Sequence, residues 1–147
     1  MPRYLGSPDP DLILYLPNPP RLPASDQPIN VPELIALNGN HWRKIFTILA
    51  KLSAGQTDWK SYRDNHLLKR KEAISFDDAL IPSCAAQIVA GKANWMRLGL
   101  STEDFCPLDE SQQLWQQQNL FLTPYFDYRQ FPNALVEQLK PYLVGQA

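Results

Sequence analysis

Residues 11–16, Asp-Leu-Ile-Leu-Tyr-Leu, place five apolar side chains in a row, and residues 17–20, Pro-Asn-Pro-Pro, follow at once. A short, continuous apolar run that stops at prolines is typical of a strand buried on both faces, as in a parallel sheet. Residues 86–90 and 119–123 have the same character and predict two more strands. Residues 73–76 predict a fourth, shorter one.

Helical patterns lie between these runs. Asn40 is expected to cap a helix that ends before Gly55, and apolar residues recur along one face of it. Further helices are predicted after Asp58, over residues 92–98, from Asp109 to Gln118, and from Pro132 or Asn133 through Leu139, where Pro141 interrupts or ends the last one. Residues 17–32 are expected to form a long, proline-rich loop.

The order of these elements predicts an α/β fold. Strands that alternate with helices indicate a short, mostly parallel central sheet covered by helices on both faces. With 147 residues, the chain is expected to form a single α/β domain over residues 1–147, with its core at about 11–143.

Charge is distributed unevenly along the chain, although the net charge is only −1. Residues 41–72 hold eight basic and three acidic side chains, a net charge of +5. Such a segment can bind phosphates, or it can be the solvated face of two helices that pairs with acidic neighbours.

Several classes of protein lack support in the sequence. It contains no apolar run near the roughly 20 residues of a membrane span and no signal peptide, so a cytoplasmic protein without membrane contact is predicted. Cys84 and Cys106 are isolated and are expected to be reduced, buried structural thiols. No metal site, nucleotide fingerprint or other cofactor site is expected.

In a parallel sheet, ligands bind beyond the carboxyl ends of the strands. Residues 17–20, 91–94 and 124–129 follow such ends. In the first segment, the Asn18 amide can orient a water or hydrogen-bond a planar ligand, or it can simply form a turn. In the second, Lys92 is a candidate phosphate contact, and Asn94 lies beside it.

Two more candidate binding regions carry aromatic residues. Asn40 and Trp42 open a helix whose N-terminus can bind an anion, unless they serve only as cap and core. The loop from Pro124 to Phe131 gathers Tyr125, Asp127 and Arg129 with further aromatics. Such a loop suits stacking on bases, a protein–protein contact, or a structural pair between Arg129 and Asp127.

The order of these motifs resembles the uracil-DNA glycosylase fold superfamily, in particular its mismatch-specific branch. The resemblance lies in the strand leading into Pro-Asn-Pro-Pro, in residues 40–43 (Asn-His-Trp-Arg), in the pair Gly91-Lys92, and in the strand before Pro124. It implies a three-layer α/β/α sandwich. Asn18 would match the asparagine that positions the attacking water, and the loop at Pro124 would match the segment that enters the duplex.

Pro17 and Pro20 stand where the glycosylase motif has glycines, and Thr-Pro-Tyr replaces the usual His-Pro-Ser or Asn-Pro-Ser. Binding of a nucleobase or of DNA is therefore a more direct expectation than glycosidic cleavage. Tyr15, Trp42 and Asn18 would form the base pocket.

Two alternatives remain open from the sequence. The first is a non-enzymatic interaction module that meets a protein partner through the aromatic loop of Pro124–Phe131. The second is an enzyme that binds a small anionic metabolite through Lys92 and Arg129.

Overall fold

The computed structural model of the chain describes residues 3–23 and 29–144. These residues form one seven-stranded sheet in the order β1-β3-β2-β4-β7-β6-β5. The strands are β1 (Tyr4–Gly6), β2 (Leu12–Tyr15), β3 (Glu72–Ser75), β4 (Ala86–Ala90), β5 (Cys106–Pro107), β6 (Trp115–Gln117) and β7 (Leu120–Thr123).

The sheet is mixed. Its four central strands, β3, β2, β4 and β7, are parallel, while β1, β6 and β5 pair antiparallel at the two sides. The prediction of a mostly parallel sheet holds for the centre and is wrong for the edges. The flanking strands are short and carry no continuous apolar run, so the pattern that revealed the central strands is missing there.

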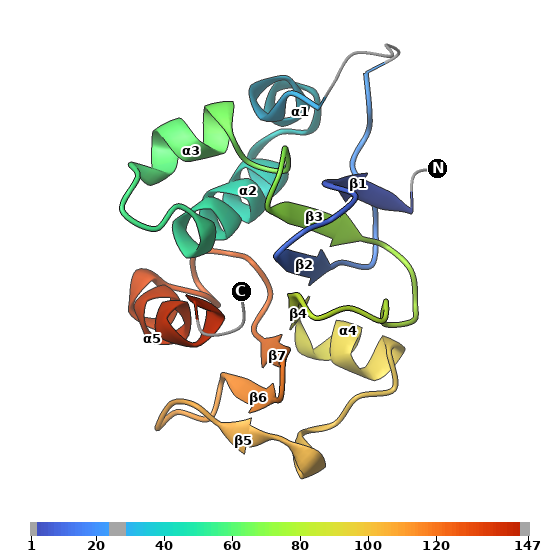
Figure 1. Ribbon diagram of the computed structural model, residues 1–147, viewed down its shortest axis with the longest axis vertical. Helices are drawn as coiled ribbons and strands as arrows, with labels where there is room; N and C mark the ends of the chain where they lie inside the picture. The colour runs from blue at the N-terminus through green and yellow to red at the C-terminus, as the bar shows by residue number, and fades with distance from the viewer. Residues whose placement is uncertain (1–2, 24–28, 145–147) are drawn as a thin grey trace.

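The helices cover the two faces unequally (Figure 1). α1, α2, α3 and α5 lie on one side of the sheet, and the short α4 lies on the other. Their bounds are α1 (Val31–Asn38), α2 (Asn40–Ser53), α3 (Trp59–Asn65), α4 (Lys92–Arg97) and α5 (Asn133–Val144), with a 3₁₀ turn over Thr102–Asp104. None of the helices in residues 3–23 and 29–144 is long and apolar enough to cross a membrane.

Alternation along the central strands divides the core in two. In β2, Leu12 and Leu14 contribute to the larger cluster with the four helices, while Ile13 and Tyr15 contribute to a smaller cluster with Trp95 of α4. This division follows from the strand geometry, because successive side chains point to opposite faces. It explains why the central strands are apolar at every position.

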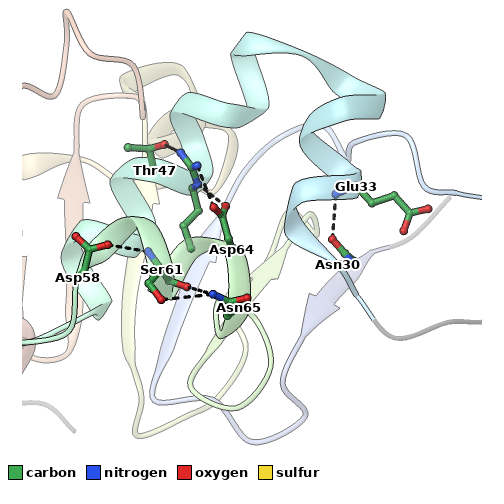
Figure 2. A network of polar contacts seen from close by, with 8 residues as sticks. Asn30, Glu33, Thr47, Asp58, Ser61, Asp64 and Asn65 are labelled. Atoms are coloured by element: carbon green, nitrogen blue, oxygen red, sulfur yellow. Dashed lines mark hydrogen bonds and ion pairs between the residues drawn. The ribbon is translucent and has the colours of Figure 1, made fainter.

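The predicted helix over residues 40–55 is confirmed as α2, which buries Trp42, Ile45, Phe46 and Leu49 among others. Asp58 caps α3 as expected, since its carboxylate accepts a hydrogen bond of 3.0 Å from the Ser61 amide (Figure 2). The strand predictions at 11–16, 73–76, 86–90 and 119–123 are confirmed to within one or two residues.

Asn40 does not cap α2, contrary to the prediction. The N-cap is Gly39, whose φ of 88° an L side chain rarely adopts, and Asn40 is the first helical residue. Gly39 is the single residue between α1, which ends at Asn38, and α2. The Asn38 side chain is itself occupied, since it accepts from the Arg21 amide at 2.7 Å and donates to the Arg21 carbonyl at 2.9 Å.

The expected loop over residues 17–32 ends earlier than predicted. Asn30 caps α1 by accepting a hydrogen bond of 3.0 Å from the Glu33 amide (Figure 2), and Pro32 lies in the first helical turn, where proline is tolerated. The part of this loop at residues 24–28 lies outside the described residues.

The helix predicted from Asp109 to Gln118 is wrong. Asp109 accepts hydrogen bonds from the amides of Gln113 and Leu114, and so it closes a turn instead of opening a helix. Gln118 has a φ of 56°, and the residues before it form β6. Pairing of β6 with β7 overrides the helical propensity of this glutamine-rich segment.

Two smaller expectations also fail. Pro141 neither ends nor interrupts the last helix, because α5 continues through it to Val144. Cys84 and Cys106 are free but exposed, since Cys84 lies in the loop before β4 and Cys106 lies in the edge strand β5.

Candidate functional site

The carboxyl edge of the parallel strands contains a point where the chain changes direction across the sheet. From β2 the chain moves to β3 on one side, and then returns to β4 on the other side of β2. Such a switch point opens a crevice beyond the strand ends, and ligands of α/β proteins bind there. The segments after β2, β4 and β7 meet at this edge, as the sequence predicted.

Asn94 holds two of these segments together. Its buried side chain donates a hydrogen bond of 2.8 Å to the Tyr15 carbonyl and accepts one of 2.8 Å from Arg97 Nε. Arg97 in turn donates to the Leu16 carbonyl at 3.3 Å. The predicted ligand contact Asn94 therefore links α4 to the end of β2.

Replacing Asn94 by Ala is expected to lower the free energy of unfolding by about 1–3 kcal/mol, because the Tyr15 carbonyl loses its buried donor. Urea denaturation measures this effect. Lys92→Ala, at an exposed position on the same helix, is the matched control and should stay within about 0.5 kcal/mol of the wild type. Equal stability of the two variants would contradict the linking role.

The two aromatic residues predicted to stack on a base lie in the core. Tyr15 is fully buried, where its hydroxyl donates to Gln87 Oε1 and accepts from the Ile81 amide, both at 2.8 Å. Burial raises the pKa of the Tyr15 hydroxyl. Trp42 is 8% exposed and packs against the rings of Phe46 and Phe76.

The exposed candidates stand on different segments of the same edge. Asn18, Asn40, Lys92 and Arg129 all have exposed side chains. Within the described residues, no hydrogen bond or ion pair joins the side chains of Asn18, Lys92 and Arg129. The contacts of these three side chains therefore do not join them into one site.

Tyr125 and His41 meet at the rim. The Tyr125 ring lies against Gly91, where an added Cβ would come within 3.2 Å of Tyr125 Cδ1. The Tyr125 hydroxyl forms a hydrogen bond of 2.8 Å with His41 Nε2, and the two rings meet edge-on at 5.6 Å between centroids. Burial, and then the charge of Asp127, raise the pKa of Tyr125.

Asp127 connects the loop after β7 to the next turn of α2. Its carboxylate accepts from the Arg129 amide at 2.9 Å and from Lys44 Nζ at 3.3 Å. These two contacts hold the pKa of Asp127 below its usual range. Asp127 thus contacts the backbone amide of Arg129, but within the described residues its ion-pair partner is Lys44 and not the Arg129 side chain.

Contacts between lysines and aromatic rings lie further along α2. Lys51 Nζ stands 4.9 Å from the centre of the Trp59 ring and 6.0 Å from that of Tyr128, while Lys44 Nζ stands 5.7 Å from the Tyr128 ring. A positive group within about 6 Å of a ring face is attracted by the ring quadrupole. The Tyr128 side chain is 45% exposed.

These contacts form one continuous surface, which we call the aromatic–basic stripe. It consists of His41, Lys44 and Lys51 on α2, interleaved with Tyr125, Tyr128 and Trp59. The loop from β7 to α5 brings the two tyrosines beside α2 (Figure 1). Two hollows lie beside Lys51, one of about 320 Å³ that reaches Tyr128 and one of about 340 Å³ that reaches Trp59.

Sequence reasoning identified Tyr125 in this stripe and missed the two lysines and Trp59 as its members. A signal was present, because His41, Lys44 and Lys51 are spaced by three and seven residues and so share one helical face. The partner loop lies about 80 residues away in the chain, and only the fold shows that the two meet.

No group of three or more His, Cys, Asp or Glu side chains placed to hold a metal ion is found in residues 3–23 and 29–144. The chain is thus a mixed α/β protein whose most distinctive surface combines cations with aromatic rings. It belongs to a family of unknown function, DUF6942, whose sequence profile matches residues 3–144. Comparison with curated proteins and with solved structures gives no match.

Proposed function

We propose that the protein binds single-stranded nucleic acid along the aromatic–basic stripe. The observation that carries this proposal is the alternation of groups, in which His41 contacts Tyr125, Lys44 and Lys51 lie near Tyr128, and Lys51 also lies over Trp59. Cations neutralise phosphates, and aromatic rings stack on bases of any sequence.

The dimensions of the stripe agree with this proposal. His41 and Lys51 are ten residues apart on α2, which corresponds to about 15 Å along the helix axis. A single strand that follows α2 over this length could therefore meet more than one cation of the stripe with its phosphates. Three acidic residues in the described part of the chain border the stripe: Asp127, which pairs with Lys44, and Asp58 and Glu137, which line the hollow beside Trp59.

The proposal retains part of the resemblance to glycosylases. The loop at Pro124, which that resemblance assigns to DNA contact, supplies Tyr125 and Tyr128 to the stripe. Asn18 is exposed after β2, at the carboxyl edge where the stripe begins. Hydrolysis of a glycosidic bond is not required for the binding proposed here.

Fluorescence anisotropy with a labelled single-stranded oligonucleotide at low salt tests the proposal. Tyr128→Ala is expected to weaken binding about 5- to 150-fold, since stacking on one aromatic contributes about 1–3 kcal/mol. Lys51→Gln is expected to lower the slope of log affinity against log salt by about 0.7. Lys60→Gln, an exposed lysine on α3 outside the stripe, is the charge-matched control.

Thermal unfolding of each variant separates binding from folding, because the Tyr128 side chain lies at the surface, 45% exposed, and its loss should leave the melting temperature nearly unchanged. Absence of oligonucleotide binding by the wild type at low salt contradicts the proposal. Equal loss of affinity in Lys51→Gln and Lys60→Gln would also contradict it, since the effect would then be one of net charge.

A further inference from the structure

A second basic cluster lies at the opposite, amino edge of the parallel strands. A pocket of about 510 Å³ opens between α3 and the start of β3 (green in Figure 1) and is lined by Thr57, Tyr62, His66, Lys69, Arg70 and Lys71. Its volume lies within the range of small-molecule sites, about 300–1,000 Å³. Lys71 immediately precedes β3, so the pocket is separate from the rim where His41 meets Tyr125.

The turn that carries Lys69, Arg70 and Lys71 is held by hydrogen bonds to a buried carboxylate. Glu72 is 1% exposed, and its carboxylate accepts hydrogen bonds from the Tyr62 hydroxyl and from the Leu68 amide, the latter at 3.0 Å. Leu68 itself has an unusual backbone conformation, with a φ of 66°. The amides of His66 and Leu67 both donate to the Tyr62 carbonyl. The cations are thus presented by an ordered turn.

The three cations of this turn have no ion-pair partner within the described residues. Lys69, Arg70 and Lys71 are all exposed. Two acidic residues lie next to this turn. Glu72 is buried with both oxygens engaged, and the exposed Asp11, whose amide donates to the Lys71 carbonyl at 2.7 Å, forms no ion pair with the turn in the part of the chain that the structure describes. A pocket lined by three cations, a histidine and the Thr57 hydroxyl offers donors to an anion with several oxygens, while the Tyr62 hydroxyl is engaged with Glu72.

We propose that this pocket binds a small, multiply charged phosphate compound of the size of a diphosphate or triphosphate. The cations converge on one pocket from a short turn, whereas those of the aromatic–basic stripe follow a helix and alternate with exposed rings. Cations that converge on one pocket can contact a compact anion together, whereas cations in an extended row can contact a strand of nucleic acid. The site is independent of the proposed nucleic-acid binding.

Isothermal titration with sodium pyrophosphate and sodium triphosphate, at constant ionic strength, tests the pocket. The wild type should bind one equivalent, and Lys69→Gln/Arg70→Gln should bind at least tenfold more weakly. Arg21→Gln/Lys60→Gln removes the same charge from exposed positions outside the pocket and should stay within twofold of the wild type. Sulfate at equal ionic strength should give no comparable binding.

Thr57 borders both this pocket and the hollow beside Trp59, so competition decides whether the two sites are separate. Saturating single-stranded oligonucleotide should leave pyrophosphate binding unchanged, as should Tyr128→Ala. Displacement by the oligonucleotide would overturn the proposal by making the pocket part of a nucleic-acid path. Failure of the wild type to bind either phosphate, or equal affinity in the two double variants, would also overturn it. If only oligonucleotide binding failed, the proposal that this pocket binds a phosphate compound would still stand.

Discussion

Gly6→Ala is expected to lower the free energy of unfolding by about 2–5 kcal/mol. Gly6 has a φ of 110°, and forcing an L residue into such a conformation costs about 1–2 kcal/mol. The new Cβ would also lie 2.5 Å from the Glu72 carbonyl oxygen and 2.9 Å from Ala73 Cα. Both atoms belong to the backbone of β3 and cannot move aside cheaply, so overpacking adds about 1–3 kcal/mol.

Chemical denaturation of Gly6→Ala beside Gly99→Ala separates the two contributions. Gly99 also has a positive φ, 73°, but an added Cβ there would meet nothing within 4 Å. Gly99→Ala should therefore show the conformational cost alone. If both variants lose the same stability, the close approach of β1 to β3 is not the cause.

Glu72→Ala is expected to lower the free energy of unfolding by about 2–6 kcal/mol at pH 7. The substitution leaves two buried donors, the Tyr62 hydroxyl and the Leu68 amide, without their acceptor, and each unsatisfied group costs about 1–3 kcal/mol. Glu103→Ala, at an exposed position, should stay within about 0.5 kcal/mol of the wild type. Similar losses in the two variants would show that the Glu72 contacts contribute little.

The Glu72 carboxyl also predicts a pH dependence. Burial raises its pKa above the ordinary value of 4.5, although hydrogen bonds from Tyr62 and Leu68 oppose this shift. The native state therefore keeps the proton to higher pH than the unfolded state does, and this contribution is complete below pH 4.5. It declines as the pH rises through the native pKa.

The Glu72→Gln variant has no titratable group at this position, so it is the reference for the pH measurement. The stability of Glu72→Gln relative to the wild type should increase as the pH rises from 4 towards 7, as measured by urea denaturation at each pH. A constant difference across that range would mean that the pKa of Glu72 is the same in the folded and unfolded chains.

The fold could be predicted where burial leaves a strong local pattern. β2, β4 and β7 are apolar at nearly every position because both faces of the central sheet are covered, and prolines or glycine mark their ends. β1 and β6 have no such pattern. β6 in particular is a Trp-Gln-Gln segment whose conformation is set by pairing with β7, a long-range contact that local propensity does not encode.

The candidate site was predictable only in part for a similar reason. The carboxyl edge followed from strand order, and the loop at Pro124 was visible because its aromatic residues are close in sequence. The partner surface on α2 was not visible, since the periodicity that predicts a helix identifies its buried face and says nothing of what meets its exposed face. The prediction for Tyr15 and Trp42 is wrong because an aromatic residue at a strand end or in the first turn of a helix has the same sequence signature in a core as in a pocket.

Both outer edges of the sheet are unsuited to the addition of a further strand. β1 has three residues, and β5 has two, one of which is Pro107, which has no amide hydrogen to donate. Long, unprotected edge strands lead to pairing between copies of a protein and to aggregation. Here a neighbouring copy would find almost no free backbone to extend. Association of two copies by strand addition is therefore disfavoured at both edges of this sheet.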